Sequence, residues 1–461
     1  MTTIIFVTIL LVFIGTYFLI GVYGARNVRT TSDYFLAGKQ AGFWGITFTL
    51  IGTQLGSGLL LGTAQKSYLY GIYGIAYTLS IVIGFLLLGS GIAAKLQALN
   101  IKTTAELFLV RYNSPLLHKC ASMLSVITLS GILMGQIVAS KGLLAGILSG
   151  TNVPILLLFI ILWGSIIIYT FAGGLHAVIR ADTFRVLFII VIYGSFFLYL
   201  LFSQPSTWFT SNILTTQQNL FVVDHETLTN IIGILVMPAL FSLIEQDLAQ
   251  RFFAARTARI AALCALAAGA FMLIFSAIPV FFGMLAKVAA LDIGQSNPLV
   301  ATLRAYSNDI VFSLGVCGIF AAMASTADSL LCAISSNIAQ DFNITAITCT
   351  HTLRIAQIIT AMVGISAATI GYFLNKDIID IIVASYEISV STLLVPSLFA
   401  YFKKDVRPVA AYTSATGGFL SFITLSIWPI PYASIVTLSI SLVCYLIGAF
   451  IDQKIAKNPS K

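Results

Sequence analysis

Hydroxyl and carboxylate side chains gather in an otherwise apolar stretch at residues 321–329. The stretch reads Ala-Ala-Met-Ala-Ser-Thr-Ala-Asp-Ser, so Ser325, Thr326, Asp328 and Ser329 fall within about one and a half helical turns. Sodium is a hard cation that takes oxygen ligands, and the three hydroxyls are ligands of that kind. A carboxylate in apolar surroundings is costly unless it faces an interior site or a partner, so Asp328 favours an ion site. The alternative is that the hydroxyls bond carbonyls one turn back and Asp328 is neutral or paired.

Two other apolar stretches contain residues that interrupt helices. Residues 52–58 read Gly-Thr-Gln-Leu-Gly-Ser-Gly, and each glycine is about 1 kcal/mol less favourable in a helix than alanine. Residues 237–239 read Met-Pro-Ala, where proline removes a backbone donor and predicts a second break at Pro238. Backbone freed in this way cannot face lipid, so the two breaks predict a shared cavity. Close packing of small residues is the alternative reading.

The elements that must position these residues are membrane helices. The chain has 461 residues, of which 59% are hydrophobic and 9% charged, with a mean hydropathy of +1.00, and this excludes a soluble fold. Apolar stretches recur that are long enough to cross a bilayer, and we expect about thirteen spans. They cover residues 3–22, 43–64, 72–94, 120–148, 152–171, 181–202, 228–247, 259–286, 311–338, 352–374, 378–402, 409–428 and 431–451. The breaks lie in the second and seventh spans, a five-span spacing that is typical of two inverted repeats.

Basic residues indicate the orientation of the chain. Most of its 24 Lys and Arg residues fall in alternate loops, which predicts an N-terminus outside and a C-terminus in the cytoplasm. We therefore expect a multi-pass protein of the cell (inner) membrane, with the lipid bilayer as a partner. The formal charge of +8 reflects this placement and does not predict nucleic-acid binding.

Several motifs occur together in a characteristic order, and through them the chain resembles the sodium:solute symporter family over roughly residues 30–402. The motifs lie at residues 33–39, 52–62, 103–107 with 111–112, 173–178 with Asp182, 245–251 and 324–329. The resemblance implies an all-α membrane protein with a LeuT-type fold of two inverted five-helix repeats. Residues 1–451 then form one transmembrane domain, with repeats at about 43–202 and 228–402, extra helices at 3–22, 409–428 and 431–451, and a short cytoplasmic basic tail at 452–461.

The same resemblance implies the ion sites. Its sodium ligands are the carbonyls of Gly52, Leu55 and Ala322 and the hydroxyls of Ser325 and Thr326. Some members hold another ion slightly deeper, and the corresponding residues here are Asp182, Asp328 and Ser329 together with Ser325. The alternative for Asp182 is an ion pair with Arg180 or Arg185.

A solute site is implied between the second and seventh spans. Its expected residues are Gln54, Gly56, Ser57, Gly58, Gln136, Pro238, Phe241, Ser242 and Glu245, with Phe241 as an aromatic inner gate. The motifs are nearest in style to the choline-transporter-like branch, but Gln54 and Glu245 stand where that branch carries tryptophan, and flat aromatic faces are what a quaternary ammonium needs. Glu245 suits a protonated amine, and Gln54 or Gln136 suits an amide or carboxylate, unless Glu245 is only an ion-pair partner of Arg251.

The sequence therefore predicts a carrier and not an enzyme. We expect a sodium-coupled symporter that imports a small polar organic solute, amino-acid-like, amine or carboxylate, by alternating access. Sodium is the co-transported ion, and no organic cofactor is expected. Two alternatives stay open: a proton-coupled carrier of the same fold, because Asp182, Asp328 and Glu245 are titratable, and a solute sensor that does not transport. The solute and the oligomeric state are left open.

Overall fold

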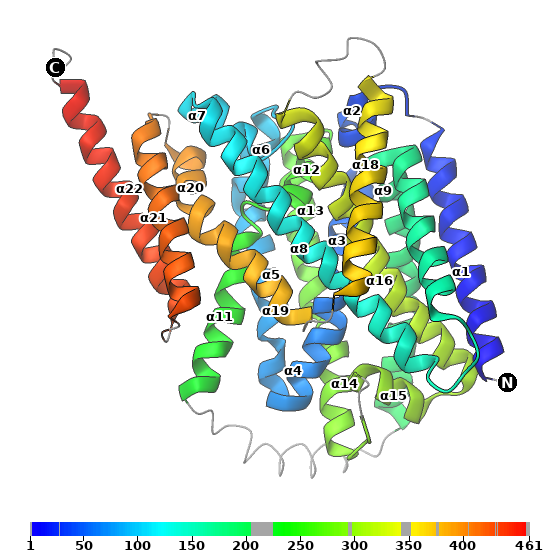
Figure 1. The fold of residues 1–461 in the computed structure, drawn as a ribbon. Coiled ribbons are helices and arrows are strands. Elements are labelled where there is room, and N and C mark those ends of the chain that lie inside the picture. The colour runs from blue at the N-terminus through cyan, green and yellow to red at the C-terminus, as the bar shows by residue number, and fades with distance from the viewer. Residues whose placement is uncertain are drawn as a thin grey trace.

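The chain folds almost entirely into helices in the computed structural model (Figure 1). The structure describes residues 2–26, 28–203, 225–293, 297–342, 352–374, 378–403, 405–428, 430 and 432–457. Within these residues the extended pairing is limited to one isolated bridge, between Ala41 and Ala255. Residues 204–224 between the two predicted repeats, and residues 458–461 of the predicted tail, lie outside the described residues.

The helices of the N-terminal half run from α1 to α9. Their bounds are α1 Thr2–Ala25, α2 Thr31–Leu36, α3 Phe43–Gln54, α4 Thr63–Tyr70, α5 Ala76–Leu87, α6 Ala93–Ala98, α7 Glu106–Tyr112, α8 Pro115–Ile147 and α9 Ile155–Ser203. A π-helical turn, η2 Gly58–Gly62, connects to α4.

The helices of the C-terminal half run from α11 to α22. Their bounds are α11 His225–Phe241, α12 Gln246–Ala254, α13 Ala258–Phe275, α14 Ala277–Val288, α15 Pro298–Tyr306, α16 Asp309–Ser336, α18 Thr352–Phe373, α19 Ile378–Ser389, α20 Val395–Phe402, α21 Pro408–Ile427 and α22 Ala433–Lys457. In Figure 1, α1 and α22 lie at opposite edges of the bundle, and α16 lies among the other helices.

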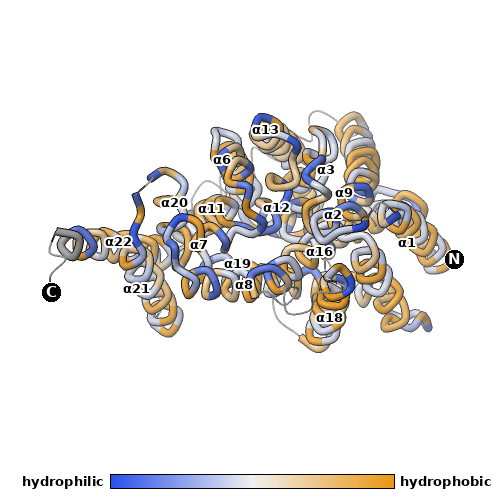
Figure 2. The backbone as a smooth tube through the Cα atoms, turned by 90° about the horizontal axis from the view of Figure 1, so that it is seen from above, coloured by the Kyte–Doolittle hydropathy of each residue, from blue (hydrophilic) through white to orange (hydrophobic). Residues whose placement is uncertain are grey.

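The helices have the composition of membrane spans. By length and hydropathy, 8 candidate spans occur in the described part of the chain. Each of the expected ranges contains described helical residues, although several spans are divided into shorter helices. Figure 2 shows apolar residues, in orange, through outer helices such as α1 and α18. The predicted all-α membrane fold is confirmed.

One element, α9, contains two of the expected spans. Gly174 has φ 50° and ψ −144°, a conformation that side chains disfavour, and a Cβ there would overlap Tyr34. Tyr169 and Arg185 lie 16 residues apart in the sequence but are hydrogen-bonded at 2.5 Å. A straight helix would separate them by about 24 Å. The chain therefore turns back at Gly174, and the two legs of α9 match the spans expected at 152–171 and 181–202.

The second span is broken where the glycines predict it. α3 ends at Gln54, and helix resumes at residue 57 before η2. Leu55 caps α3 with a non-helical ψ of 42°. The helix is therefore interrupted at residues 55–56, near the middle of the span expected at 43–64.

The seventh span is also broken, but the position predicted at Pro238 is wrong. α11 continues through Pro238 to Phe241, and the break lies at residues 242–245, before α12. The Ala239 amide, next to the proline, donates a hydrogen bond to Ser80 Oγ of α5 at 2.8 Å. This bond offsets the loss of regular helical hydrogen bonding that proline causes, so the helix continues to Phe241.

Hydrogen bonds tie the two broken helices together at one end. The Ala41 amide donates to the Ala254 carbonyl and the Arg256 amide donates to the Ala41 carbonyl, both at 3.1 Å. The Gln250 side chain donates to the Phe35 carbonyl at 2.8 Å. The start of α3 and the end of α12 are therefore held in one place.

Outside the spans, α2 is a short helix with a reciprocal cap. Its Thr30 side chain accepts from the Asp33 amide, and the Asp33 carboxylate accepts from the Thr30 amide at 2.9 Å. Partial burial raises the pKa of Asp33, but hydrogen bonds from Thr30 and Arg29 outweigh it and leave the pKa lowered. The cap fixes the chain just before the second span.

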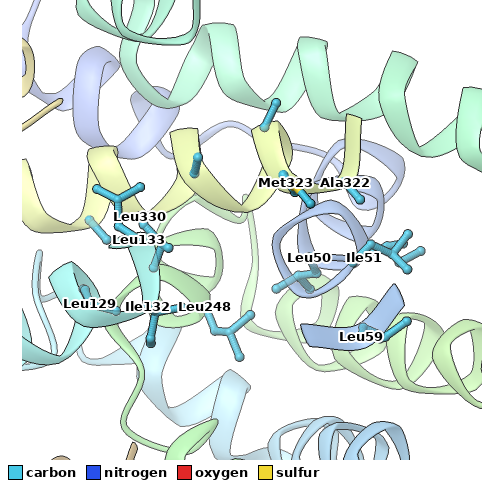
Figure 3. Packing of buried hydrophobic residues seen from close by; sticks show 14 of the residues in the cluster. Leu50, Ile51, Leu59, Leu129, Ile132, Leu133, Leu248, Ala322, Met323 and Leu330 are labelled. Atoms are coloured by element: carbon cyan, nitrogen blue, oxygen red, sulfur yellow. The ribbon is translucent and has the colours of Figure 1, made fainter. Parts of the chain in front are cut away.

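Apolar side chains from several helices pack around the two breaks. Figure 3 shows Leu50, Ile51 and Leu59 of the second span near Ala322 and Met323 of α16, with Ile132 and Leu133 of α8 close by. All of these are buried. This packing positions the polar groups described next.

Candidate functional site

The hydroxyls of α16 lie against the break in the second span. Thr326 Oγ1 donates to the Thr53 carbonyl at 2.9 Å and also lies 3.3 Å from the Ala322 carbonyl. Ser325 Oγ, one residue earlier, donates to Asp182 on the second leg of α9. Both hydroxyls are buried, so the crossing of α3 and α16 is a polar point inside an apolar bundle.

Glycine makes this close crossing possible. A Cβ on Gly52 would overlap Ser325 Oγ, and a Cβ on Gly56 would lie 2.7 Å from Thr326 Oγ1. Only a residue without a side chain lets the α3 backbone approach these hydroxyls. The glycines that predicted the break also account for the contact.

Four of the five predicted sodium ligands, Gly52, Ala322, Ser325 and Thr326, lie at this crossing, and Leu55 lies in the adjoining break. The carbonyl oxygens of Gly52 and Leu55 accept none of the hydrogen bonds that the described residues form outside their helices. The Ala322 carbonyl and the hydroxyls of Ser325 and Thr326 lie directly opposite. Three carbonyl and two hydroxyl oxygens make a donor set that suits a hard monovalent cation.

The second predicted ion set surrounds a guanidinium. Arg185 Nη1 lies 2.6 Å from Asp328 Oδ2 and 3.6 Å from Asp182 Oδ1, and all three side chains are fully buried. Tyr169 also donates to Asp328 Oδ2. Of the two ion-pair partners proposed for Asp182, Arg185 is the one in contact, whereas Arg180 lies over the Tyr23 ring.

A second buried guanidinium, that of Arg251 on α12, reaches the same region. Its Nη1 donates to the Asp247 carbonyl at 2.5 Å, its Nε to Thr49 Oγ1 at 3.3 Å, and its Nη2 to Ser329 Oγ. Thr49 in turn donates to Asp182 Oδ2 at 2.5 Å. Ser329, the hydroxyl of the predicted second ion set, is therefore already bonded to an arginine.

A small polar cavity lies beside the crossing. Its volume is about 20 Å³, enough for about one water molecule. Its lining includes the predicted solute residues Gln54, Gly56, Gly58, Gln136 and Glu245, together with Tyr77, Tyr386, Asp247 and Thr326. Gln54 Nε2 donates to Glu245 Oε2 at 3.2 Å, and the Ser57 amide donates to Gln136 Oε1 at 2.9 Å. This central cavity joins the two breaks.

The other four predicted solute residues do not line this cavity: Ser57 lines the larger cavity described below, Phe241 lines a second small cavity, and Pro238 and Ser242 lie at the end of α11. Ser242 donates through both its amide and its hydroxyl to the Pro238 carbonyl, at 3.0 and 2.8 Å, and packs against Gly84 of α5. Neither Pro238 nor Ser242 lines the central cavity. They shape the end of α11 and hold it against α5.

Phe241 lies between the central cavity and a second small cavity. Its ring centroid is 4.7 Å from that of Tyr386, which lines the central cavity. Phe241 itself lines another cavity of about 20 Å³, bounded by Thr104, Phe108 and Ser389. The aromatic pair therefore separates the two spaces, as an inner gate would.

On the opposite side a much larger cavity reaches the break. It has a volume of about 1020 Å³ and is lined by residues of α1, η2, α4, α8, α15 and the segment after α14. Gly58 lines both this cavity and the central one. The bundle is therefore wide on the α15 side of the site and narrow on the Phe241 side.

Sequence reasoning missed part of the site. Tyr77 gave no signal, since it is one of 18 tyrosines and bonds Tyr386, at 3.1 Å, only after folding. Asp247 lies beside Glu245, and an acidic residue in an apolar span was a usable signal. Arg185 was considered only as a partner for Asp182, although Asp328 is its nearer carboxylate.

Broken helices that meet at a buried oxygen cluster, with cavities on both sides, define a membrane protein of the LeuT-fold class. A family model, the sodium:solute symporter family, matches residues 34–418. The chain belongs to the sodium:solute symporter family.

Individual relatives agree with this membership. The chain is 26% identical over 165 residues to a sodium/glucose cotransporter of Vibrio parahaemolyticus, covering 35% of this chain and 30% of that protein. It is 24% identical over 189 residues to the sodium/pantothenate symporter of Escherichia coli (strain K12), covering 40% and 38%. The matched segments thus span about a third of these relatives, which are transporters and not enzymes.

Solved structures show the same fold. A Na+-coupled sialic acid symporter in its substrate-bound outward-open state matches with a TM-score of 0.80 and 17% identity, over 97% of this chain and 98% of that one. Mhp1, a nucleobase-cation-symport-1 family transporter in a closed conformation, matches with a TM-score of 0.55 and 12% identity, over 92% and 94%.

Proposed function

We propose that this chain is a sodium-coupled symporter that imports a small polar organic solute bearing an amine. The observation that carries the proposal is the meeting of the Ser325 and Thr326 hydroxyls with the broken second span, directly beside the cavity of Glu245. An ion at the crossing and a solute in the cavity would share the residues around the break. Binding of one would therefore order the site of the other.

Sodium is proposed to bind at the carbonyls of Gly52, Leu55 and Ala322 and the hydroxyls of Ser325 and Thr326. The Thr326 hydroxyl now bonds the α3 backbone, and an ion between the two helices would replace that bond with oxygen coordination. Such an ion would hold α3 against α16 and stabilise one arrangement of the bundle.

The charges around the central cavity support an amine. Glu245 and Asp247 both line the cavity, and the guanidinium of Arg251 lies on the same turn as Asp247. Two carboxylates and one guanidinium leave one negative charge, which a protonated amine balances. Gln54, Gln136 and the two tyrosine hydroxyls remain for the polar groups of an amino-acid-like solute.

Alternating access would then connect the two cavities in turn. The wide cavity on the α15 side gives entry, and displacement of the Phe241 and Tyr386 rings opens the narrow side. The placement of basic residues supports an inner-membrane protein with the N-terminus outside and the C-terminus in the cytoplasm.

A proton-coupled carrier is the second candidate. Glu245 and Asp247 face the same small cavity, and two carboxylates so close together favour retention of a proton on one of them. Proton release from this pair could drive solute movement without sodium.

Thermal unfolding of the purified full chain tests the first proposal. Amino acids, amines and carboxylates are added one at a time in sodium chloride or potassium chloride at fixed pH. We expect an amine-bearing compound to raise the melting temperature in sodium only. Uptake of that compound into proteoliposomes then separates a symporter from a sensor, and full uptake in potassium driven by a pH gradient would favour the proton-coupled candidate.

A further inference from the structure

The guanidinium of Arg185 lies where a second coupling ion would bind. The residues predicted for that position are Asp182 on α9 and Asp328 and Ser329 on α16, up to one turn beyond Ser325. Arg185 Nη1 lies 2.6 Å from Asp328 and 3.6 Å from Asp182. The positive charge is therefore within direct reach of both carboxylates.

This guanidinium is enclosed on every side by protein groups. It lies over the Tyr17 ring of α1, with its carbon 4.4 Å from the ring centroid, and 5.3 Å from the centroid of Tyr169. Its Nη2 donates to the Tyr169 hydroxyl at 2.5 Å, and the side chain has no exposed surface. An arginine keeps its proton in proteins, so this position permanently holds a cation.

The remaining ligand of the second position is also occupied. Ser329 Oγ accepts from Arg251 and donates to the Ser325 carbonyl at 2.8 Å. Asp182 uses its two oxygens to accept from Ser325 and from Thr49. Both carboxylates of this set therefore already have a cation or a hydrogen-bond donor beside them.

The charges of the cluster formed by Asp182, Asp328 and Arg185 determine how many sodium ions can bind. With the guanidinium of Arg251 counted with Glu245 and Asp247 as above, Asp182, Asp328 and Arg185 together carry one formal negative charge. Asp182 connects this cluster to the sodium crossing through its hydrogen bond from Ser325. One sodium ion balances that charge. A second ion would leave an uncompensated positive charge in the bundle interior, which is strongly unfavourable.

We propose that Arg185 is a built-in cation that takes the place of a second sodium, so that this chain couples to a single sodium ion. The inference rests on the proposed sodium site and adds its stoichiometry. Arg185 then determines ion number without touching the transported sodium.

Binding of ²²Na+ to the purified full chain tests this proposal without knowledge of the solute. Sodium is titrated in potassium chloride of constant ionic strength. We expect one bound sodium per chain with a Hill coefficient near one. Arg185→Gln removes the cation and leaves both carboxylates, so we expect two bound sodium ions. Arg185→Lys keeps the charge, and the count should stay at one.

The outcomes separate the two proposals. Two sodium ions on the unmodified chain, or one on a folded Arg185→Gln variant, would overturn the built-in cation and leave sodium coupling intact. Zero sodium on the unmodified chain would overturn the sodium site and, with it, this inference. Monodisperse elution and a cooperative melt identify folded variants, and if neither variant folds, the count on the unmodified chain decides.

Discussion

The Thr326 hydroxyl of α16 donates a hydrogen bond to the Thr53 carbonyl of α3 across 2.9 Å. The two residues are 273 positions apart, yet this bond joins the uninterrupted helix of the site to the last turn before the break. Separation of α16 from α3 would break it. The contact therefore lies where ion binding and the conformation of the bundle can affect one another.

Removing both hydroxyls should abolish the response to sodium. For Ser325→Ala with Thr326→Ala we expect at least a tenfold loss of sodium affinity, about 1.4 kcal/mol, because two of five oxygen ligands are gone. Sodium-dependent thermal stabilisation measures it. Ser335→Ala is the matched control, since Ser335 is also buried on α16 but its hydroxyl bonds the Leu331 carbonyl of its own helix. Unchanged sodium affinity in the double variant would refute the site.

Adding a methyl group where the second span contacts α16 should also weaken sodium binding, in this case through a steric clash. A Cβ in Gly56→Ala would press on Thr326 Oγ1 and on the Gln136 amide, at 2.7 and 3.2 Å. We expect weaker sodium binding and a loss of about 1–3 kcal/mol of stability. Gly194→Ala is the control, because a Cβ there meets nothing within 4 Å. Equal behaviour of the two variants in thermal unfolding would contradict the proposed packing.

Neutralising Glu245 should weaken amine binding and spare sodium. Glu245→Gln can keep a hydrogen bond with Gln54 but removes one charge from the central cavity. We expect amine-dependent stabilisation to fall at least tenfold in apparent affinity while ²²Na+ binding changes little. Glu106→Gln, a carboxylate that caps the chain near α7, is the comparison. Loss of sodium binding in Glu245→Gln would instead place this carboxylate at the ion.

Truncating the inner aromatic pair should open the narrow side. Phe241→Ala removes the ring that lies against Tyr386, so we expect sodium to leak through proteoliposomes without solute. Leak is measured as ²²Na+ efflux. Phe271→Ala, which loses a ring stacked on Phe275 at 5.5 Å, provides the control. A Phe241→Ala variant with no increase in ²²Na+ efflux would contradict the proposed gate.

Some parts of the site follow from local sequence and others do not. Ser325 and Thr326 could be selected from the sequence because Asp328 and Ser329 follow them within one helical turn, and Gly52 because its effect on a helix is local. The position of the second break was not predictable, since Ser80, 159 residues from Ala239, supplies the bond that lets α11 continue past Pro238.

The pairing of Arg185 with Asp328 also could not be predicted from the local sequence. These residues are 143 positions apart, and the nearer Asp182 offered an obvious local partner. Their contact depends on the turn at Gly174, which brings both legs of α9 beside α16. Long-range packing of this kind selects one partner among several that the sequence allows.

The buried guanidinium of Arg185 has a consequence for how far the carrier can concentrate its solute. A sodium ion moving down a tenfold gradient and through 100 mV releases about 3.7 kcal/mol, which supports roughly a 500-fold accumulation of a net-neutral solute. A second ion would square that ratio and double the sodium that the cell must expel. With Arg185 fixed in the second position, each solute molecule therefore enters with half as many sodium ions as in a two-sodium carrier, and the limit on its accumulation is lower.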